Sequence, residues 1–364
     1  SYAELSSMYP KEAAEYNYTK NAFRKNTLAF VIGWILIVSA IFSASTVALG
    51  FAGYFTHMFG GNLIFIAGVL IVILTFVNYR GIKESSRFNI IATVVEASGL
   101  ILIIIAGILF FSPANIDFFE MKNGMVGILS ATALIFFAYI GFEDIANVSE
   151  ETKNATKVIP RALMLSIVIS TILYIAVAVA AVGMVGAERL ASSKAPLTEA
   201  ISSAVPQAGM LMSIIALFAT SNTVLVLLVV ASRMMYGISC QRDLPKAFSK
   251  ICKRGTPLYS VIAAGVVAIL GLFIGGIETV ALFTTAGIFI AYFFVNASLI
   301  YLRYKKPKQK RPFRVPLNIG RFPVISFIGA VTCAVMLFYF DMTIIAMELG
   351  VIVVGVAVYR AMKR

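Results

Sequence analysis

The sequence consists of long apolar runs separated by short polar segments. From Asn26 to Tyr79 no Asp, Glu, Lys or Arg occurs, and a glycine-containing turn at 57–62 divides this run in two. The hydrocarbon core of a bilayer is about 30 Å thick, so a helix needs about 20 apolar residues to cross it. Helices are favoured there because every backbone polar group must be paired within the segment. Each apolar run therefore predicts a membrane-spanning helix.

The same criterion predicts ten spanning helices, which we expect to form a single domain over residues 1–364. They cover 28–55, 63–78, 88–111, 125–148, 162–186, 207–236, 257–274, 278–302, 322–340 and 342–359. Residues 1–9 are interpreted as the end of a further helix, because the sequence starts at Ser1 and has no complete span before Asn26. We therefore expect an all-α membrane protein whose first helix lies upstream of this sequence.

Composition agrees with a lipid environment, since 60% of residues are hydrophobic and only 13% are charged. When the segments between spans are assigned alternately to two sides, all Lys and Arg residues except Lys122, Arg189 and Lys194 fall on one side. The positive-inside rule places that side, and the C-terminus with it, in the cytoplasm. We expect a multi-pass protein of the cell membrane. This distribution explains the net charge of +13 without a nucleic-acid partner.

Residues that carry enzyme or metal chemistry are scarce. The chain has three cysteines and one histidine, His57, and no HExxH motif or pair of intramembrane aspartates. Neither a metal cluster nor an even set of disulfides can be assembled from them. We expect no catalytic residues, no metal and no cofactor.

Polar residues inside the spans are the informative exceptions, because the bilayer disfavours them. Glu96 stands alone within 88–111 and has to face the bundle interior, pair with another group or hold a proton. It is predicted to couple transport of a solute to a proton or cation, and the alternative is a structural hydrogen bond. Ser221, Asn222 and Thr223 could supply oxygens to a cation or join one helix to another.

The segment FFAYIGFE, residues 136–143, favours an interruption of the span 125–148. Gly141 weakens a helix, and the acids that follow it suit the first turn of a new half-helix, whose dipole favours negative charge. Such breaks are tolerated at membrane depth where they line a cavity, and their free carbonyl and amide groups then bind solutes. The alternative is that Gly141 is only a packing site.

Four segments resemble one family of transporters, the amino acid–polyamine–organocation permeases. They are SYAELSSMYPKEAAEY (1–16), GIKESSRFN (81–89), FFAYIGFEDIANVSEETKNATKVIPRA (136–162) and SRMMYGISCQRDLP (232–245). The resemblance implies the leucine-transporter-like fold, an inverted five-plus-five helix repeat with two further C-terminal helices. The ten predicted spans would then be helices 3 to 12, with helix 1 and most of helix 2 missing.

The resemblance also implies where solutes bind. Backbone carbonyls at the break of helix 6 would hold the substrate amino group, and they correspond here to Phe137, Ala138 and Ile140. Gly141 and Glu143 complete this predicted substrate site. Ser221 and Asn222 fall where sodium-coupled relatives place ion-facing hydroxyls, so they join Glu96 as predicted coupling residues.

Three positions depart from the family pattern. Glu96 stands where close members often carry a lysine, and an acid there is expected to titrate or to pair with a cation. Ser39 replaces an acid that is frequent in cationic amino acid permeases, which favours a neutral substrate. Ala155 replaces a proline after Asn154, and we expect only a softer loop.

The sequence therefore predicts secondary active transport of an amino acid, with a proton or cation as coupling partner and the lipid bilayer as surroundings. A polyamine or amine exchanger of the same fold is one alternative. A membrane subunit that does not transport is another, and the sequence does not identify a partner subunit.

Overall fold

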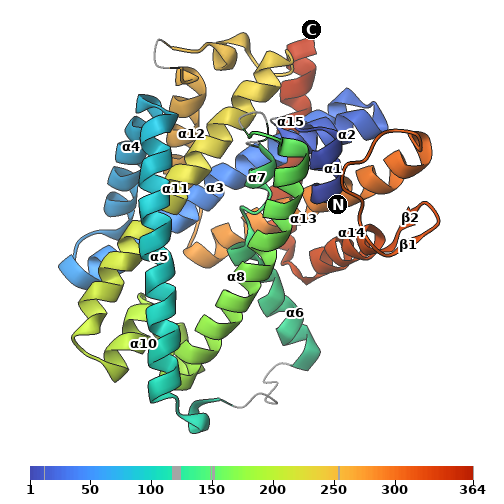
Figure 1. The fold of residues 1–364 in the computed structure, drawn as a ribbon. Coiled ribbons are helices and arrows are strands. Elements are labelled where there is room, and N and C mark those ends of the chain that lie inside the picture. Colours follow the sequence, from blue (N-terminus) through green and yellow to red (C-terminus); the bar gives the residue numbers. More distant parts are fainter. Residues whose placement is uncertain (12, 117–123, 148, 150–151, 253–254, 364) are drawn as a thin grey trace.

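The structure, a computed structural model, is built almost entirely of helices (Figure 1). It describes residues 1–11, 13–116, 124–147, 149, 152–252 and 255–363, with the backbone alone for 82–88. Within these residues, eight helical segments are long and apolar enough to cross a membrane. The prediction of an all-α membrane protein is confirmed.

The long helices are α3 (Asn26–Phe59), α4 (Leu63–Arg80), α5 (Ile82–Phe110), α8 (Ala155–Val185), α11 (Ala208–Cys240), α13 (Ile277–Lys305) and α15 (Met342–Lys363). The eighth segment combines α6 (Gly124–Ile135), the 3₁₀ helix η2 (Phe136–Tyr139) and α7 (Asp144–Asn147). The remaining helices are α1 (Tyr2–Met8), α2 (Ala14–Phe23), η1 (Pro113–Asn115), α9 (Ala187–Ser192), α10 (Pro196–Ala204), η4 (Lys246–Ser249), α12 (Leu258–Gly271), α14 (Val324–Met336) and η5 (Leu337–Tyr339).

Helix α3 is the central element of the bundle. It packs against α2, α4, α11, α12, α13 and α15, and it runs obliquely behind α5 and α11 in Figure 1. Its 34 residues would extend about 50 Å at 1.5 Å per residue, which exceeds the hydrocarbon thickness and requires a tilt. The fold therefore centres on one long, inclined helix.

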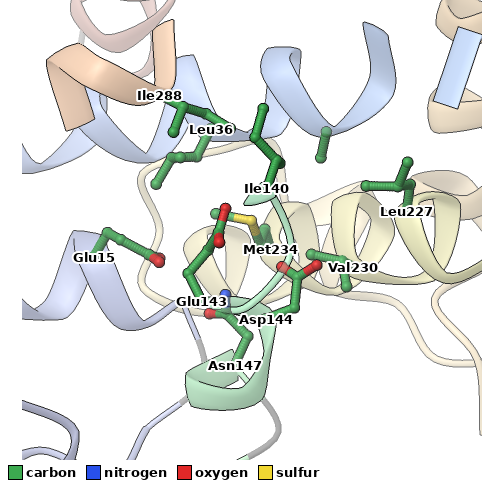
Figure 2. Close-up of a pocket in the computed structure, with 11 residues that line it drawn as sticks. Glu15, Leu36, Ile140, Glu143, Asp144, Asn147, Leu227, Val230, Met234 and Ile288 are labelled. Carbon is green, nitrogen blue, oxygen red and sulfur yellow. The ribbon is translucent and has the colours of Figure 1, made fainter. Parts of the chain in front are cut away.

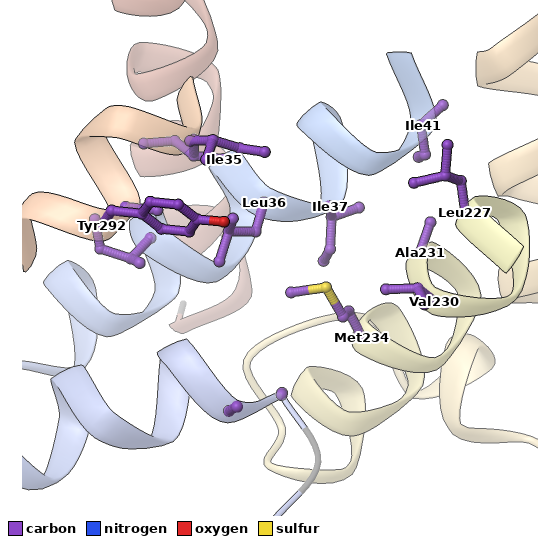
Figure 3. Packing of buried hydrophobic residues seen from close by; sticks show 14 of the residues in the cluster. Ile35, Leu36, Ile37, Ile41, Leu227, Val230, Ala231, Met234 and Tyr292 are labelled. Carbon is purple, nitrogen blue, oxygen red and sulfur yellow. The ribbon is translucent and has the colours of Figure 1, made fainter. Parts of the chain in front are cut away.

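The contact between α3 and α11 is formed by aliphatic side chains. Figure 3 shows Ile37 and Ile41 of α3 opposite Val230, Ala231 and Met234 of α11. All five are buried. Residues at spacings of three and four lie on the same face of a helix, which is why these positions meet across the interface.

Turn residues separate the first two long helices. Gly60 and Gly61 have φ values of +74° and +111°, which side-chain-bearing residues rarely adopt. The Asn62 side chain then accepts a hydrogen bond of 3.0 Å from the Phe65 N–H and caps the start of α4. The chain reverses here because the glycines that end α3 are followed directly by the asparagine that caps α4.

A small hairpin follows α13. Strand β1 (Asn318–Ile319) pairs antiparallel with β2 (Phe322–Pro323), with Asn318 opposite Pro323 and Gly320 at a φ of +62° in the turn. The hairpin contacts α13 and α14 and stands beside α14 in Figure 1.

Close approach of α5 and α8 generates the first prediction. A Cβ atom on Gly107 would lie 2.3 Å from the Cβ and 2.7 Å from the Cα of Ala180. We expect Gly107→Ala to destabilise the fold by about 1 to 3 kcal/mol, because the clash includes backbone. Thermal unfolding in detergent measures this.

Gly50→Ala in α3 is the matched control, because a Cβ there meets nothing within 4 Å. Alanine should be neutral or slightly stabilising there, since it is the better helix former. Equal melting temperatures for the two variants would contradict the close α5–α8 contact.

Candidate functional site

The helix formed by α6 is interrupted over residues 136–143. It continues as the 3₁₀ turn η2, Ile140 is extended with ψ 134°, and Gly141 has a φ of +115°. Helical geometry resumes at Asp144. Because that value of φ is strained for any residue with a side chain, glycine is required at 141. The interruption that the sequence indicated is present in the structure.

Backbone groups at the break are partly free. The Phe137 carbonyl accepts a bond of 3.2 Å from the Ile140 N–H, and the Ala138 carbonyl accepts one of 2.9 Å from the Tyr174 hydroxyl of α8. Among the described residues, none donates to the Ile140 carbonyl. Of the three predicted carbonyls, one therefore has no donor among the described residues, one accepts from a side chain and one accepts from the backbone.

Glu143 turns back onto the break. Its Oε2 accepts a hydrogen bond of 2.9 Å from the Gly141 N–H, and the residue is 5% exposed. Aromatic rings surround this segment, with the Tyr292 centroid 5.6 Å from Phe142 and 6.1 Å from Phe136. The irregular backbone is thus fixed by its own side chain and enclosed by apolar rings.

Three carboxylates lie around one small cavity on the α7 side of the break. Figure 2 shows Glu15, Glu143 and Asp144 directed toward the same region, with Asn147 below them. The cavity measures about 20 Å³, which is room for about one water molecule. Its other lining residues are apolar except for Asn147, and they include Leu36, Ala40, Ile140, Leu227, Val230, Met234 and Ile288.

Glu15 is the most unusual member of this cluster. It is fully buried at the start of α2, and neither carboxylate oxygen has a hydrogen-bond partner among the described residues. Burial raises the pKa of Glu15 from 4.5 to about 7, and the charge of Glu143 acts in the same direction. The position is fixed by the neighbouring Ala14, whose N–H donates to the Asn147 side chain over 2.9 Å.

The predicted coupling residues lie elsewhere. Glu96 is half-buried on α5, outside the lining of the acidic cavity. The Ser221 hydroxyl donates to the Leu217 carbonyl of its own helix over 2.6 Å. Asn222 donates to the Asn89 side chain over 2.8 Å and thereby joins α11 to α5. Their coupling role stays a prediction.

Sequence reasoning missed Glu15, Asn147 and Tyr174. An acid in a polar segment between helices is normally solvated, so nothing local distinguishes Glu15 from other loop acids. Its burial depends on α2 folding back onto α7, a contact between residues 133 positions apart. Asp144 carried a signal, since two consecutive acids directly follow Gly141 and Phe142.

The Glu15 site makes stability depend on pH. The folded state binds an extra proton between pH 4.5 and about 7, so the free energy of unfolding falls as pH rises through that window. Glu15→Gln removes the titration, and we expect it to be more stable than the parent at pH 8 by up to about 3 kcal/mol. Denaturation in detergent at pH 4.5 and pH 8 measures the difference.

At pH 4.5 the gain should largely vanish. Glu278→Gln is the control, because Glu278 is exposed at the start of α13. A gain of the same size at both pH values would mean that Glu15 is not a titrating buried acid.

The chain is similar in sequence to several membrane transporters. The family model described as amino acid permease matches residues 1–356. The methylthioribose transporter of Bacillus subtilis is 31% identical over 362 residues, covering 91% of this chain and 75% of that protein. The branched-chain amino acid permease BcaP of the same organism is 29% identical over 99% of this chain and 81% of its own length.

BcaP of Lactococcus lactis is also 29% identical, over 90% of this chain and 76% of its own length. These relatives are transporters, and the family model covers the helical core described above together with the interrupted helix. The chain belongs to the amino acid permease family of the amino acid–polyamine–organocation superfamily.

Proposed function

We propose that this protein is a secondary transporter that moves a neutral amino acid across the cell membrane, coupled to a proton or another cation. The observation that carries the proposal is the interrupted helix at 136–143, where a free backbone carbonyl lies beside buried carboxylates. Irregular backbone at membrane depth is expected only where it lines a cavity. Its two half-helices can then move relative to their neighbours while the solute is bound.

The substrate ammonium group would bind to the carbonyls of Phe137, Ala138 and Ile140. An ammonium has three donors and no acceptor, so backbone carbonyls with spare lone pairs suit it. Gly141 sets the backbone direction there, and Glu143 adds negative charge behind it. With the C-terminus in the cytoplasm, α7 would form the cytoplasmic half of this broken helix.

The proposed side-chain preference rests on apolar surroundings. Leu36, Ile140 and Ile288 line the region next to the break, and Ser39 on α3 is buried without adding a charge. Relatives named for branched-chain amino acids point the same way. The relative named for methylthioribose points to another uncharged small molecule, so that compound is included in the test below.

An amine or polyamine exchanger is the second candidate, and one observation favours it. Glu15, Glu143 and Asp144 line a cavity that has no Lys or Arg in its described lining. A volume of about 20 Å³ is nevertheless suited to a water molecule, a proton relay or a small ion rather than an organic cation. The neutral amino acid remains the better proposal.

Uptake into proteoliposomes by the full-length protein tests the function. We expect labelled leucine or valine to accumulate, with methylthioribose, arginine and putrescine as competitors. Gly141→Ala should reduce uptake about tenfold or more at unchanged folding, because alanine disfavours a φ of +115°. Gly124→Ala, also at positive φ but outside the break, is the control and should retain most uptake.

Preferential uptake of putrescine would replace the proposal with the amine exchanger. No uptake of any of these compounds by well-folded protein would favour the non-transporting subunit.

Coupling is proposed to involve Glu96, with Glu15 and Glu143 as further acids near the break. We expect Glu96→Gln to flatten the dependence of uptake on external pH, since the amide cannot exchange a proton. Uptake measured from pH 5 to pH 8 would show this, with Glu278→Gln as the exposed control. An unchanged pH profile would remove Glu96 from the coupling mechanism.

A further inference from the structure

A second cavity lies at the end of α13, away from the interrupted helix. It measures about 440 Å³ and is lined by Arg303, Pro307, Lys308, Gln309, Arg311, Arg314 and Arg321. Five of these residues are cationic and none is acidic. The charges therefore surround a defined space and are not merely spread along a loop.

Two guanidinium groups form a fixed floor. Arg303 is 3% exposed, donates from Nε to Glu4 over 2.8 Å, and donates from Nη1 to the Asn318 side chain over 2.7 Å. Arg311 Nε lies 3.1 Å from Glu4, so one carboxylate serves both arginines. Among the described residues, one positive charge at the floor therefore has no matching carboxylate.

Arg311 is also held by backbone. Its Nη1 donates over 2.8 Å to the Gln309 carbonyl, and its Nη2 donates over 3.0 Å to the Lys306 carbonyl and over 3.2 Å to that of Leu302. These bonds close the chain around the cavity and fix its shape without a ligand. Side chains that are already ordered lose little entropy when an anion binds.

The rim consists of three exposed cations, Lys308, Arg314 and Arg321. Arg314 donates to the Gly320 carbonyl over 3.2 Å, while Lys308 and Arg321 have no ion-pair partner among the described residues. Arginine forks match the oxygens of phosphate, and a flexible lysine adds a mobile charge. A phosphate-bearing anion fits this arrangement best.

The adjoining hairpin indicates where that phosphate comes from. Leu317 and Ile319 are 71% and 75% exposed, on either side of Asn318 and close in sequence to Arg314 and Arg321. Large apolar side chains next to cations are typical of a surface that enters the bilayer interface. A soluble phosphate would gain nothing from them, whereas a phospholipid places acyl chains beside its headgroup.

We propose that this cavity binds the headgroup of an anionic phospholipid, with Leu317 and Ile319 inserted beside its acyl chains. The segment follows a membrane-spanning helix directly, so the headgroup region is within reach. Basic pockets at the ends of spanning helices bind anionic headgroups by this chemistry. Because Glu4 belongs to α1, the bound lipid would lie against the ion pairs that join α1 to α13.

Lipid binding to the purified full-length protein tests the proposal independently of transport. The probes are phosphatidylglycerol, phosphatidylcholine and inorganic phosphate, measured by native mass spectrometry and by the shift in melting temperature. We expect the parent to retain phosphatidylglycerol over phosphatidylcholine. The variant Lys308→Gln/Arg314→Gln/Arg321→Gln should bind phosphatidylglycerol about tenfold more weakly or worse.

Two comparisons make the test decisive. Lys25→Gln/Lys153→Gln/Lys250→Gln removes the same charge from exposed sites outside the cavity and should keep parental binding. Leu317→Ser/Ile319→Ser should weaken phosphatidylglycerol binding by several-fold. Equal loss in the two charge variants would show diffuse attraction and overturn the site. Phosphate that competes fully, with no effect of the hairpin variant, would show a soluble-anion site and overturn the lipid assignment.

Discussion

A carboxylate removed from water must either find donors or hold a proton, and this constraint divides the buried acids of the protein into two groups. Glu4 belongs to the first group. Its carboxylate accepts hydrogen bonds from the Arg303 side chain and from the Val315 N–H, and it forms an ion pair with Arg311. Asp243 belongs there too, because Tyr16 and Lys363 contact it. Glu15 belongs to the second group, with both oxygens unpartnered among the described residues. The paired acids join segments that are distant in sequence, whereas the unpaired acid makes the stability of the fold depend on pH.

The same constraint acts on the backbone of the interrupted helix. An apolar bundle tolerates an irregular backbone only when the polar groups of that backbone find hydrogen-bond partners nearby. At the break, the Glu143 carboxylate accepts a hydrogen bond from the Gly141 N–H, and the Tyr174 hydroxyl donates one to the Ala138 carbonyl. These two bonds stabilise the irregular turn between α6 and α7. No described residue donates a hydrogen bond to the Ile140 carbonyl. The side chains that stabilise the turn and the carbonyl that has no donor therefore lie within a few residues of each other.

Much of the fold was predictable because the relevant signals are local. Charge-free runs define spanning helices, and Gly141 followed by acids indicates an interruption. The two charged cavities were not predictable, because each depends on residues far apart in sequence. Glu15 is buried by α7, and the basic cavity depends on Glu4, which lies 299 positions from Arg303. A run of basic residues such as 303–314 indicates on which side of the membrane a loop lies, but it does not indicate whether the side chains enclose a cavity.

The bond between Tyr174 and Ala138 has a consequence for selectivity. In the proposed substrate site, an ammonium that takes the place of this hydroxyl on the Ala138 carbonyl exchanges one hydrogen bond for another. Net binding then reflects an exchange of partners, and an isolated amine gains little from it, because a neutral hydrogen bond lost offsets much of the charged one gained. Only a solute with additional contacts elsewhere in the bundle would tip that balance. In that proposal the tyrosine hydroxyl competes with the solute for the carbonyl, which would disfavour amines that make no other contact with the bundle.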